Sequence, residues 1–134
     1  MRVLTVCTGN SFRSPVAEAL TRQFHPTFEV ESAGTYPATH IAHNGKGLLE
    51  REGARVYVKP HPDKITQRAI DEADLIVVFK QRHKDYILEN FKVSEDKIIN
   101  WDIDDPIGPT IEPEEAFEKI KAQVKELSLQ NEKE

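Results

Sequence analysis

The chain opens with Met1-Arg2-Val3-Leu4-Thr5-Val6-Cys7-Thr8-Gly9-Asn10-Ser11-Phe12-Arg13-Ser14, followed by Pro15-Val16-Ala17-Glu18-Ala19-Leu20. Residues 2–6 have the apolar pattern of a short buried strand, and the segment from Ser14 onward is typical of the first turns of a helix. A loop between a strand and a helix N-terminus directs backbone N–H groups into one concavity, where the helix dipole adds partial positive charge. The opening segment therefore predicts a strand–loop–helix unit with an oxyanion site in its loop.

Cys7, the single cysteine of the chain, lies at the base of this predicted loop. Gly9 permits a tight backbone there, and Asn10 can adopt a left-handed conformation or bond the loop internally. Arg13 is spaced to fold back over the concavity and to grip an oxyanion with two N–H groups. A lone cysteine is more often a small buried hydrophobe. The Arg13-Ser14 pair favours a nucleophile instead, because a cation and a helix N-terminus stabilise the thiolate.

Strands and helices are expected to alternate along the rest of the chain, which is typical of an α/β fold with a parallel sheet. The expected strands are Arg2–Val6, Phe28–Ser32, Asp74–Phe79 and Lys97–Asn100, with an extended segment at Val56–Val58. The expected helices are Ser14–Phe24, His40–Glu52, Thr66–Asp71, Arg82–Asn90 and Pro113–Leu127. We predict one domain over residues 1–134, a three-layer sandwich with a four-stranded parallel sheet flanked by helices, and a frayed tail from about residue 129. Ligands of such sheets bind beyond the carboxyl ends of the strands, where Cys7 lies.

Composition excludes several function classes. The 134 residues are 38% hydrophobic and 31% charged, with a net charge of −5, which argues against nucleic acid as a partner. No apolar run approaches the length of a membrane span, and a chain that starts at once with a core strand indicates a cytoplasmic protein without a signal peptide. One cysteine excludes an internal disulfide, and no metal site or cofactor is expected. The five histidines are expected on the surface or in loops: His25, His40, His43, His61 and His83.

Four segments, in order along the chain, resemble the low-molecular-weight protein tyrosine phosphatases. They are Val3–Leu20, Glu31-Ser32-Ala33-Gly34-Thr35, Ala73-Asp74-Leu75-Ile76-Val77-Val78 and Trp101-Asp102-Ile103-Asp104-Asp105-Pro106. The resemblance implies a phosphate-binding loop after the first strand, with Cys7 as the nucleophile and Arg13 as the phosphoryl-binding residue. It implies that the substrate is held by Thr8, Gly9, Asn10, Ser11, Phe12, Arg13 and Ser14.

The aspartate directly before a proline is the general acid of that family, so the resemblance assigns this role to Asp105. Asp104 is a weaker rival, and an acidic surface turn made with Asp102 is the plain alternative, because Asp-rich turns are common. The resemblance also implies that Ser14 bonds the cysteine sulfur, although the same residue suits an N-cap. Asn10 and Ser32 are expected to brace the loop.

The expected activity is hydrolysis of protein phosphotyrosine, or of small aryl phosphates, through a phosphocysteine. Phosphate, vanadate and arsenate are the expected inhibitory ligands. Protein-arginine phosphatases of the same family carry a polar threonine where this chain has Ser11, so that activity is an alternative. An arsenate reductase is a weaker one, since the thioredoxin-coupled enzymes need further cysteines, and a non-catalytic phosphate-binding module is the last.

Two departures from the family pattern concern the walls of the substrate cleft and the support of the loop. Ile107-Gly108 stand where eukaryotic members have aromatic residues, and Tyr36 or Tyr57 are possible substitutes. The family often has a supporting histidine before the third strand, for which His61 is the nearby candidate.

Overall fold

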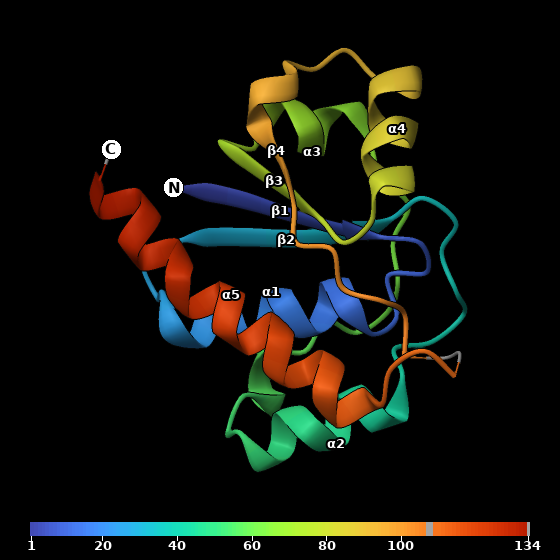
Figure 1. Ribbon diagram of the computed structural model, residues 1–134, viewed down its shortest axis with the longest axis vertical. Helices are drawn as coiled ribbons and strands as arrows, with labels where there is room; N and C mark the ends of the chain where they lie inside the picture. The colour runs from blue at the N-terminus through green and yellow to red at the C-terminus, as the bar shows by residue number, and fades with distance from the viewer. Residues whose placement is uncertain (107–108, 134) are drawn as a thin grey trace.

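The sheet confirms the expected α/β class. The computed structural model describes residues 1–106 and 109–133, with the side chains of residues 1–106 and 109–127. Four parallel strands, in the order β2-β1-β3-β4, form the sheet (Figure 1). They are β1 Arg2–Cys7, β2 Glu29–Gly34, β3 Leu75–Val78 and β4 Ile98–Asn100.

Helices cover both faces of the sheet. On one face lie α1 Arg13–Phe24, α2 His43–Arg51 and α5 Pro113–Lys133, and on the other lie α3 Gln67–Glu72 and α4 Gln81–Asn90 (Figure 1). Two short 3-10 turns, η1 Arg55–Tyr57 and η2 Glu95–Lys97, complete the order of elements. Within the described residues, no helix combines the length and apolar character that crossing a membrane requires.

The central strand β1 decides on which side the candidate nucleophile lies. Its side chains alternate between the faces, so Leu4 and Val6 enter the hydrophobic core shared with α3 and α4. Val3 and Cys7 enter the opposite core, shared with α1 and α5. Burial of both faces explains why this strand is an apolar run rather than an alternating one.

Apart from shifts of one or two residues at element ends, two expected elements before α5 differ from the observed ones. The helix predicted from His40 begins at His43, because the preceding chain is tied to the loop after β1: the Ala42 N–H donates to the Ser11 carbonyl at 3.0 Å. The extended segment predicted at Val56–Val58 is wrong. Val56 and Tyr57 belong to η1, which ends where the Val58 N–H donates to the Arg55 carbonyl, and only Val58 has an extended backbone.

At the C-terminus, α5 continues to Lys133, beyond the expected end at Leu127. The side chains from residue 128 onward lie outside the described part, and the frayed tail and the single-domain organisation stay predictions. Ile107 and Gly108, considered as cleft walls, also lie outside the described residues.

Candidate active site

The loop from Cys7 to Arg13 is held with its carbonyl groups facing outward. The Thr8 carbonyl accepts the Tyr36 N–H at 2.8 Å, and the Gly9 carbonyl accepts the Ala38 N–H at 2.9 Å. In a planar trans peptide the C=O and the following N–H point in opposite directions. These bonds therefore turn the following loop N–H groups away from residues 35–42 and toward the inside of the loop.

Gly34, at the end of β2, lets the loop pack this closely. A Cβ on Gly34 would lie 2.6 Å from the Thr8 carbonyl oxygen and 3.0 Å from the Asn10 nitrogen. Both are backbone atoms, which cannot give way without moving the loop. A glycine is therefore required here by close approach of the two segments.

Cys7 lies at the base of the loop and is 2% exposed. Its Sγ is 3.0 Å from the Ser14 hydroxyl oxygen, at the contact the resemblance implied. Ser14 is fully buried and is not the N-cap of α1, which is Phe12. A hydroxyl in this position can donate to a thiolate and stabilise its negative charge.

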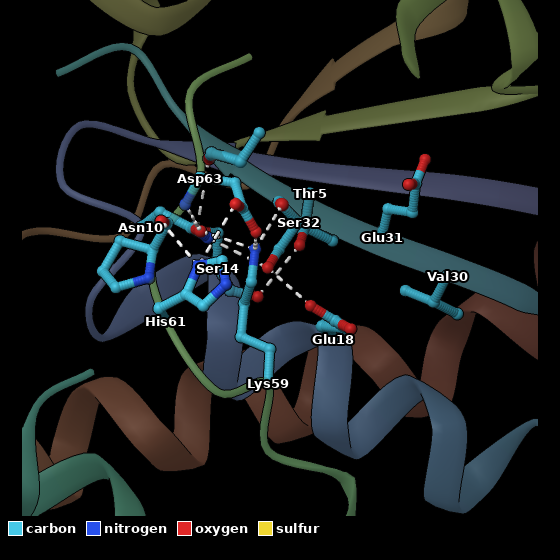
Figure 2. A network of polar contacts seen from close by, with 12 residues as sticks. Thr5, Asn10, Ser14, Glu18, Val30, Glu31, Ser32, Lys59, His61 and Asp63 are labelled. Atoms are coloured by element: carbon cyan, nitrogen blue, oxygen red, sulfur yellow. Dashed lines mark hydrogen bonds and ion pairs between the residues drawn. The ribbon is translucent and has the colours of Figure 1, made fainter. Parts of the chain in front are cut away.

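Asn10 is the hub that fixes the shape of the loop (Figure 2). It is fully buried and has a left-handed backbone, with φ of 51°. Its amide nitrogen donates to the Ser14 hydroxyl at 2.8 Å and to the Ser32 hydroxyl at 2.9 Å. Its amide oxygen accepts from Lys59 Nζ at 2.7 Å and from the Asp63 N–H at 2.9 Å. The amide thus uses both its donors and its oxygen, which holds the αL conformation in place.

Lys59 and Glu18 complete this network, and sequence reasoning missed both. The Lys59 side chain, 10% exposed, also donates to the Ser32 carbonyl at 2.8 Å and pairs with Asp63 Oδ2 at 2.9 Å. The buried Glu18 carboxylate accepts the Ser32 hydroxyl at 2.5 Å, and burial raises its pKa despite Ser32 and Arg22. Glu18 lies within a helix, and nothing in the neighbouring sequence indicates that its carboxylate contacts Ser32 of β2.

His61 does not take the supporting place considered for it. It is exposed, and its Nδ1 lies 3.3 Å from Asp63 Oδ1 rather than at Asn10. The ammonium of Lys59 occupies the position beside the Asn10 amide oxygen.

Arg13 connects the loop of residues 7–13 to the segment after β4. The side chain is 2% exposed; its Nη1 donates to the Ile103 carbonyl at 3.1 Å, and its Nη2 lies 3.6 Å from Asp105 Oδ2. Burial lowers the pKa of Arg13, while the charges of Cys7 and Asp105 act in the opposite direction. A buried guanidinium that remains charged is a strong anion-binding group.

The carboxylates of the acidic turn, Asp102, Asp104 and Asp105, bind different partners. Asp102 has a left-handed backbone with φ of 53°, and its Oδ1 accepts from Lys80 Nζ at 2.8 Å. Lys80 Nζ also lies 2.5 Å from Asp104 Oδ1, and this bond lowers the pKa of Asp104. Asp105 instead faces Arg13. Asp105 lines the cavity with Cys7, whereas Asp104 is held by Lys80 and is not among the lining residues, so the geometry favours Asp105 over Asp104 as the acid.

Eight residues line a cavity of about 180 Å³ at this end of the sheet: Cys7, Thr8, Gly9, Ser11, Phe12, Arg13, Ala38 and Asp105. Asn10 and Ser14, expected to hold substrate, are fully buried and brace the loop from behind. The Ser11 hydroxyl donates to the His40 carbonyl at 2.8 Å. Tyr36 is 79% exposed, and neither it nor Tyr57 is among the lining residues.

His83 contradicts the expectation that the histidines are on the surface or in loops. It is 1% exposed on the first turn of α4, and its Nε2 lies 2.9 Å from the Thr8 hydroxyl oxygen. Its position just after a buried strand was the available signal, because the carboxyl end of β3 meets that of β1 at the same sheet edge.

Comparisons with known proteins agree with this geometry. The profile of the family described as low molecular weight phosphotyrosine protein phosphatase matches residues 2–134. A protein-arginine-phosphatase of Geobacillus stearothermophilus is 33% identical over 123 residues, 83% of this chain and 82% of that protein. The low molecular weight protein-tyrosine-phosphatase PtpB of Staphylococcus epidermidis is 29% identical over 142 residues, 98% of this chain and 100% of that protein.

A solved structure shares the fold across the whole chain. It is that of the YwlE arginine phosphatase mutant with a phosphorylated active-site serine, with a TM-score of 0.89 and 23% identity over 100% of this chain and 97% of the other. The profile match covers the loop of residues 7–13, the acidic turn and all four strands. The chain therefore belongs to the low-molecular-weight phosphotyrosine protein phosphatase family.

Proposed function

We propose that this chain hydrolyses protein phosphotyrosine through a covalent phosphocysteine at Cys7. The observation that carries the proposal is that Cys7, Arg13 and Asp105 line one cavity, with the guanidinium and the Asp105 carboxylate 3.6 Å apart. A nucleophile, an oxyanion-binding cation and a proton donor are the three groups that phosphoryl transfer to a thiolate requires.

In the first step the Cys7 thiolate attacks phosphorus. The S–P bond forms and the P–O bond to the leaving group breaks, while Asp105 transfers its proton to the departing oxygen. Arg13 and the loop N–H groups hold the three equatorial oxygens. In the second step Asp105, now a carboxylate, takes a proton from water, whose oxygen bonds phosphorus as Cys7 departs as thiolate. Phosphate is the product, and Ser14 stabilises the thiolate at both ends of the cycle.

The depth of the nucleophile supports a long phosphorylated side chain as substrate. Cys7 is 2% exposed, at the base of a cavity of about 180 Å³. A phosphotyrosine extends its phosphoryl group across the length of an aromatic ring, whereas phosphoserine carries it one methylene from the backbone. We therefore expect the longer side chain to bring phosphorus to the buried Cys7 more readily than the short one.

Phosphoarginine is the second candidate, and the Ser11 hydroxyl is the observation that favours it. Ser11 donates its hydrogen to the His40 carbonyl, so its oxygen can act as an acceptor at the rim of the cavity. A guanidinium leaving group offers N–H donors to such an acceptor and to the Asp105 carboxylate. The arginine-phosphatase relative supports the same reading.

The test compares hydrolysis of phosphotyrosine, phosphoarginine and phosphoserine versions of one peptide, each with and without EDTA. We expect phosphotyrosine to be hydrolysed fastest and EDTA to have no effect. Cys7→Ser should lose turnover while still binding phosphate or vanadate. A faster rate with phosphoarginine would favour the second candidate. Binding of phosphate by the wild-type protein without turnover of any peptide would indicate a binding module and end the proposal.

A further inference from the structure

His83 is a buried imidazole that the mechanism above does not use. It belongs to the first turn of α4, yet it reaches the phosphate loop, where its Nε2 lies 2.9 Å from Thr8 Oγ1. Thr8 lines the cavity together with Cys7 and Arg13. The contact therefore connects α4, the helix that follows β3, to a residue in the wall of the cavity.

The other ring nitrogen determines where the imidazole carries its hydrogen. His83 Nδ1 accepts the Lys80 N–H at 3.1 Å and the Phe79 N–H at 3.4 Å, at the start of α4. A ring nitrogen that accepts hydrogen bonds carries no hydrogen, so in the neutral ring the hydrogen lies on Nε2. Nε2–H then donates to the Thr8 hydroxyl oxygen.

The surroundings keep this ring neutral. Burial lowers the pKa of His83 to about 3, and the nearby charges of Arg13, Arg82 and Lys80 act in the same direction. A doubly protonated ring would also lose its acceptor for the two backbone N–H groups. The tautomer with hydrogen on Nε2 is thus the one that satisfies every contact of the ring.

The tautomer of His83 restricts the direction in which the Thr8 hydroxyl can donate its hydrogen. An oxygen that accepts from His83 must direct its own hydrogen to another acceptor, and Thr8 is at the cavity wall. We propose that His83 is a positioning residue, which orients the Thr8 hydroxyl as a hydrogen-bond donor into the phosphate cavity. This proposal rests on the phosphatase function proposed above. It adds a neutral donor for a phosphoryl oxygen beside the charged Arg13.

Two substitutions separate this role from the capping of α4. In His83→Gln the side-chain N–H₂ can reach the place of Nε2 and donate to Thr8. In His83→Asn the side-chain oxygen can take the place of Nδ1 and accept from Lys80 and Phe79, but nothing donates to Thr8. We expect His83→Gln to keep kcat/KM within about twofold. His83→Asn should lower it about three- to tenfold and weaken inorganic phosphate binding similarly, as expected for one lost hydrogen bond. The reverse order would mean that His83 only caps the helix, and would overturn the proposal.

A matched control is His25→Asn, which removes a histidine that bonds the Val124 carbonyl away from the cavity, and should leave kcat/KM unchanged. A double-mutant cycle adds Thr8→Val: the His83→Asn loss should disappear in the Thr8→Val background, and additive losses would contradict the proposal.

Nitrogen NMR of the wild-type protein provides a readout independent of turnover. We expect the His83 signals of a neutral ring with hydrogen on Nε2 down to about pH 5. A ring with hydrogen on Nδ1 would overturn the proposal. If the wild-type protein hydrolyses no phosphopeptide, the proposed function fails, while phosphate affinity and the NMR tautomer still decide the role of His83.

Discussion

Lys59 supports the loop of residues 7–13 through its bond to Asn10, and replacing Lys59 with methionine tests how much of the loop's geometry depends on that support. Met has nearly the same length and volume but no ammonium group. The substitution removes the donors to the Asn10 amide oxygen at 2.7 Å and to the Ser32 carbonyl at 2.8 Å. It also removes the ion pair with Asp63, whose side chain is 52% exposed.

The two buried hydrogen bonds of Lys59 account for most of the expected loss of unfolding free energy. An ion pair with a half-exposed carboxylate contributes about 0–1 kcal/mol. Hydrogen bonds to a charged donor contribute about 1.5–3 kcal/mol each, and the loss is partly offset because the ammonium no longer has to be desolvated. We therefore expect Lys59→Met to lower the free energy of unfolding by about 2–4 kcal/mol, or Tm by about 7–14 °C for a chain of this length.

Function should suffer along with stability, since Asn10 would keep only the Asp63 N–H at its amide oxygen. We expect kcat/KM for an aryl phosphate to fall about tenfold, because a hydrogen bond of the loop scaffold is lost. The assays are urea denaturation followed by circular dichroism and steady-state kinetics at a temperature where the variant is folded.

Two variants serve as controls for Lys59→Met. Lys64→Met makes the same charge change on an exposed side chain that bonds the Thr35 carbonyl. Asp63→Asn breaks the ion pair but keeps the backbone N–H to Asn10. Both should cost less than about 1 kcal/mol. If Lys59→Met loses no more stability than Lys64→Met, the argument from the buried network is wrong.

Asp105→Asn should lower kcat about 10²–10⁴-fold for phosphotyrosine and less for nitrophenyl phosphate, whose leaving group departs without a proton. Lys80 holds the carboxylate of Asp104, so Asp104→Asn should change either rate little. A larger defect in Asp104→Asn than in Asp105→Asn would reverse the assignment of the general acid. Arg13→Lys should lower kcat/KM about 10²–10³-fold, because a point charge cannot make two-point contact with phosphoryl oxygens, and near-normal kinetics would make Arg13 structural. Burial raises the pKa of Glu18, so its contribution to stability is present below the unfolded value of 4.5 and is lost as pH rises through the raised folded value. The unfolding free energy of wild type minus that of Glu18→Gln should therefore fall as pH rises above about 4.5, and urea denaturation that finds the opposite slope would contradict the burial argument.

Local sequence was sufficient for the sheet strands and for the loop after β1. The apolar run before Cys7, the glycine and asparagine of the loop and the helix that follows are contiguous, so short-range preferences and burial act on the same few residues. The same reasoning failed at Val56–Val58, where an extended segment was expected. Val56 is 80% exposed and belongs to a 3-10 turn, so it gains none of the burial that stabilises the strands of the sheet.

The pairing of Cys7 with Arg13, and the family that it indicates, could thus be read from the sequence alone, because spacing within one strand–loop–helix unit fixes which groups share a concavity. The sequence could not show that Lys80 would bind Asp104 and leave Asp105 facing Arg13, that Lys59 would occupy the place considered for His61, or that His83 would reach Thr8. These contacts join residues 24 to 92 positions apart, or depend on which neighbouring carboxylate a lysine reaches. Parallel strands bring their carboxyl ends to one edge of the sheet whatever separates them in the chain, and only their packing in three dimensions decides which side chains meet there.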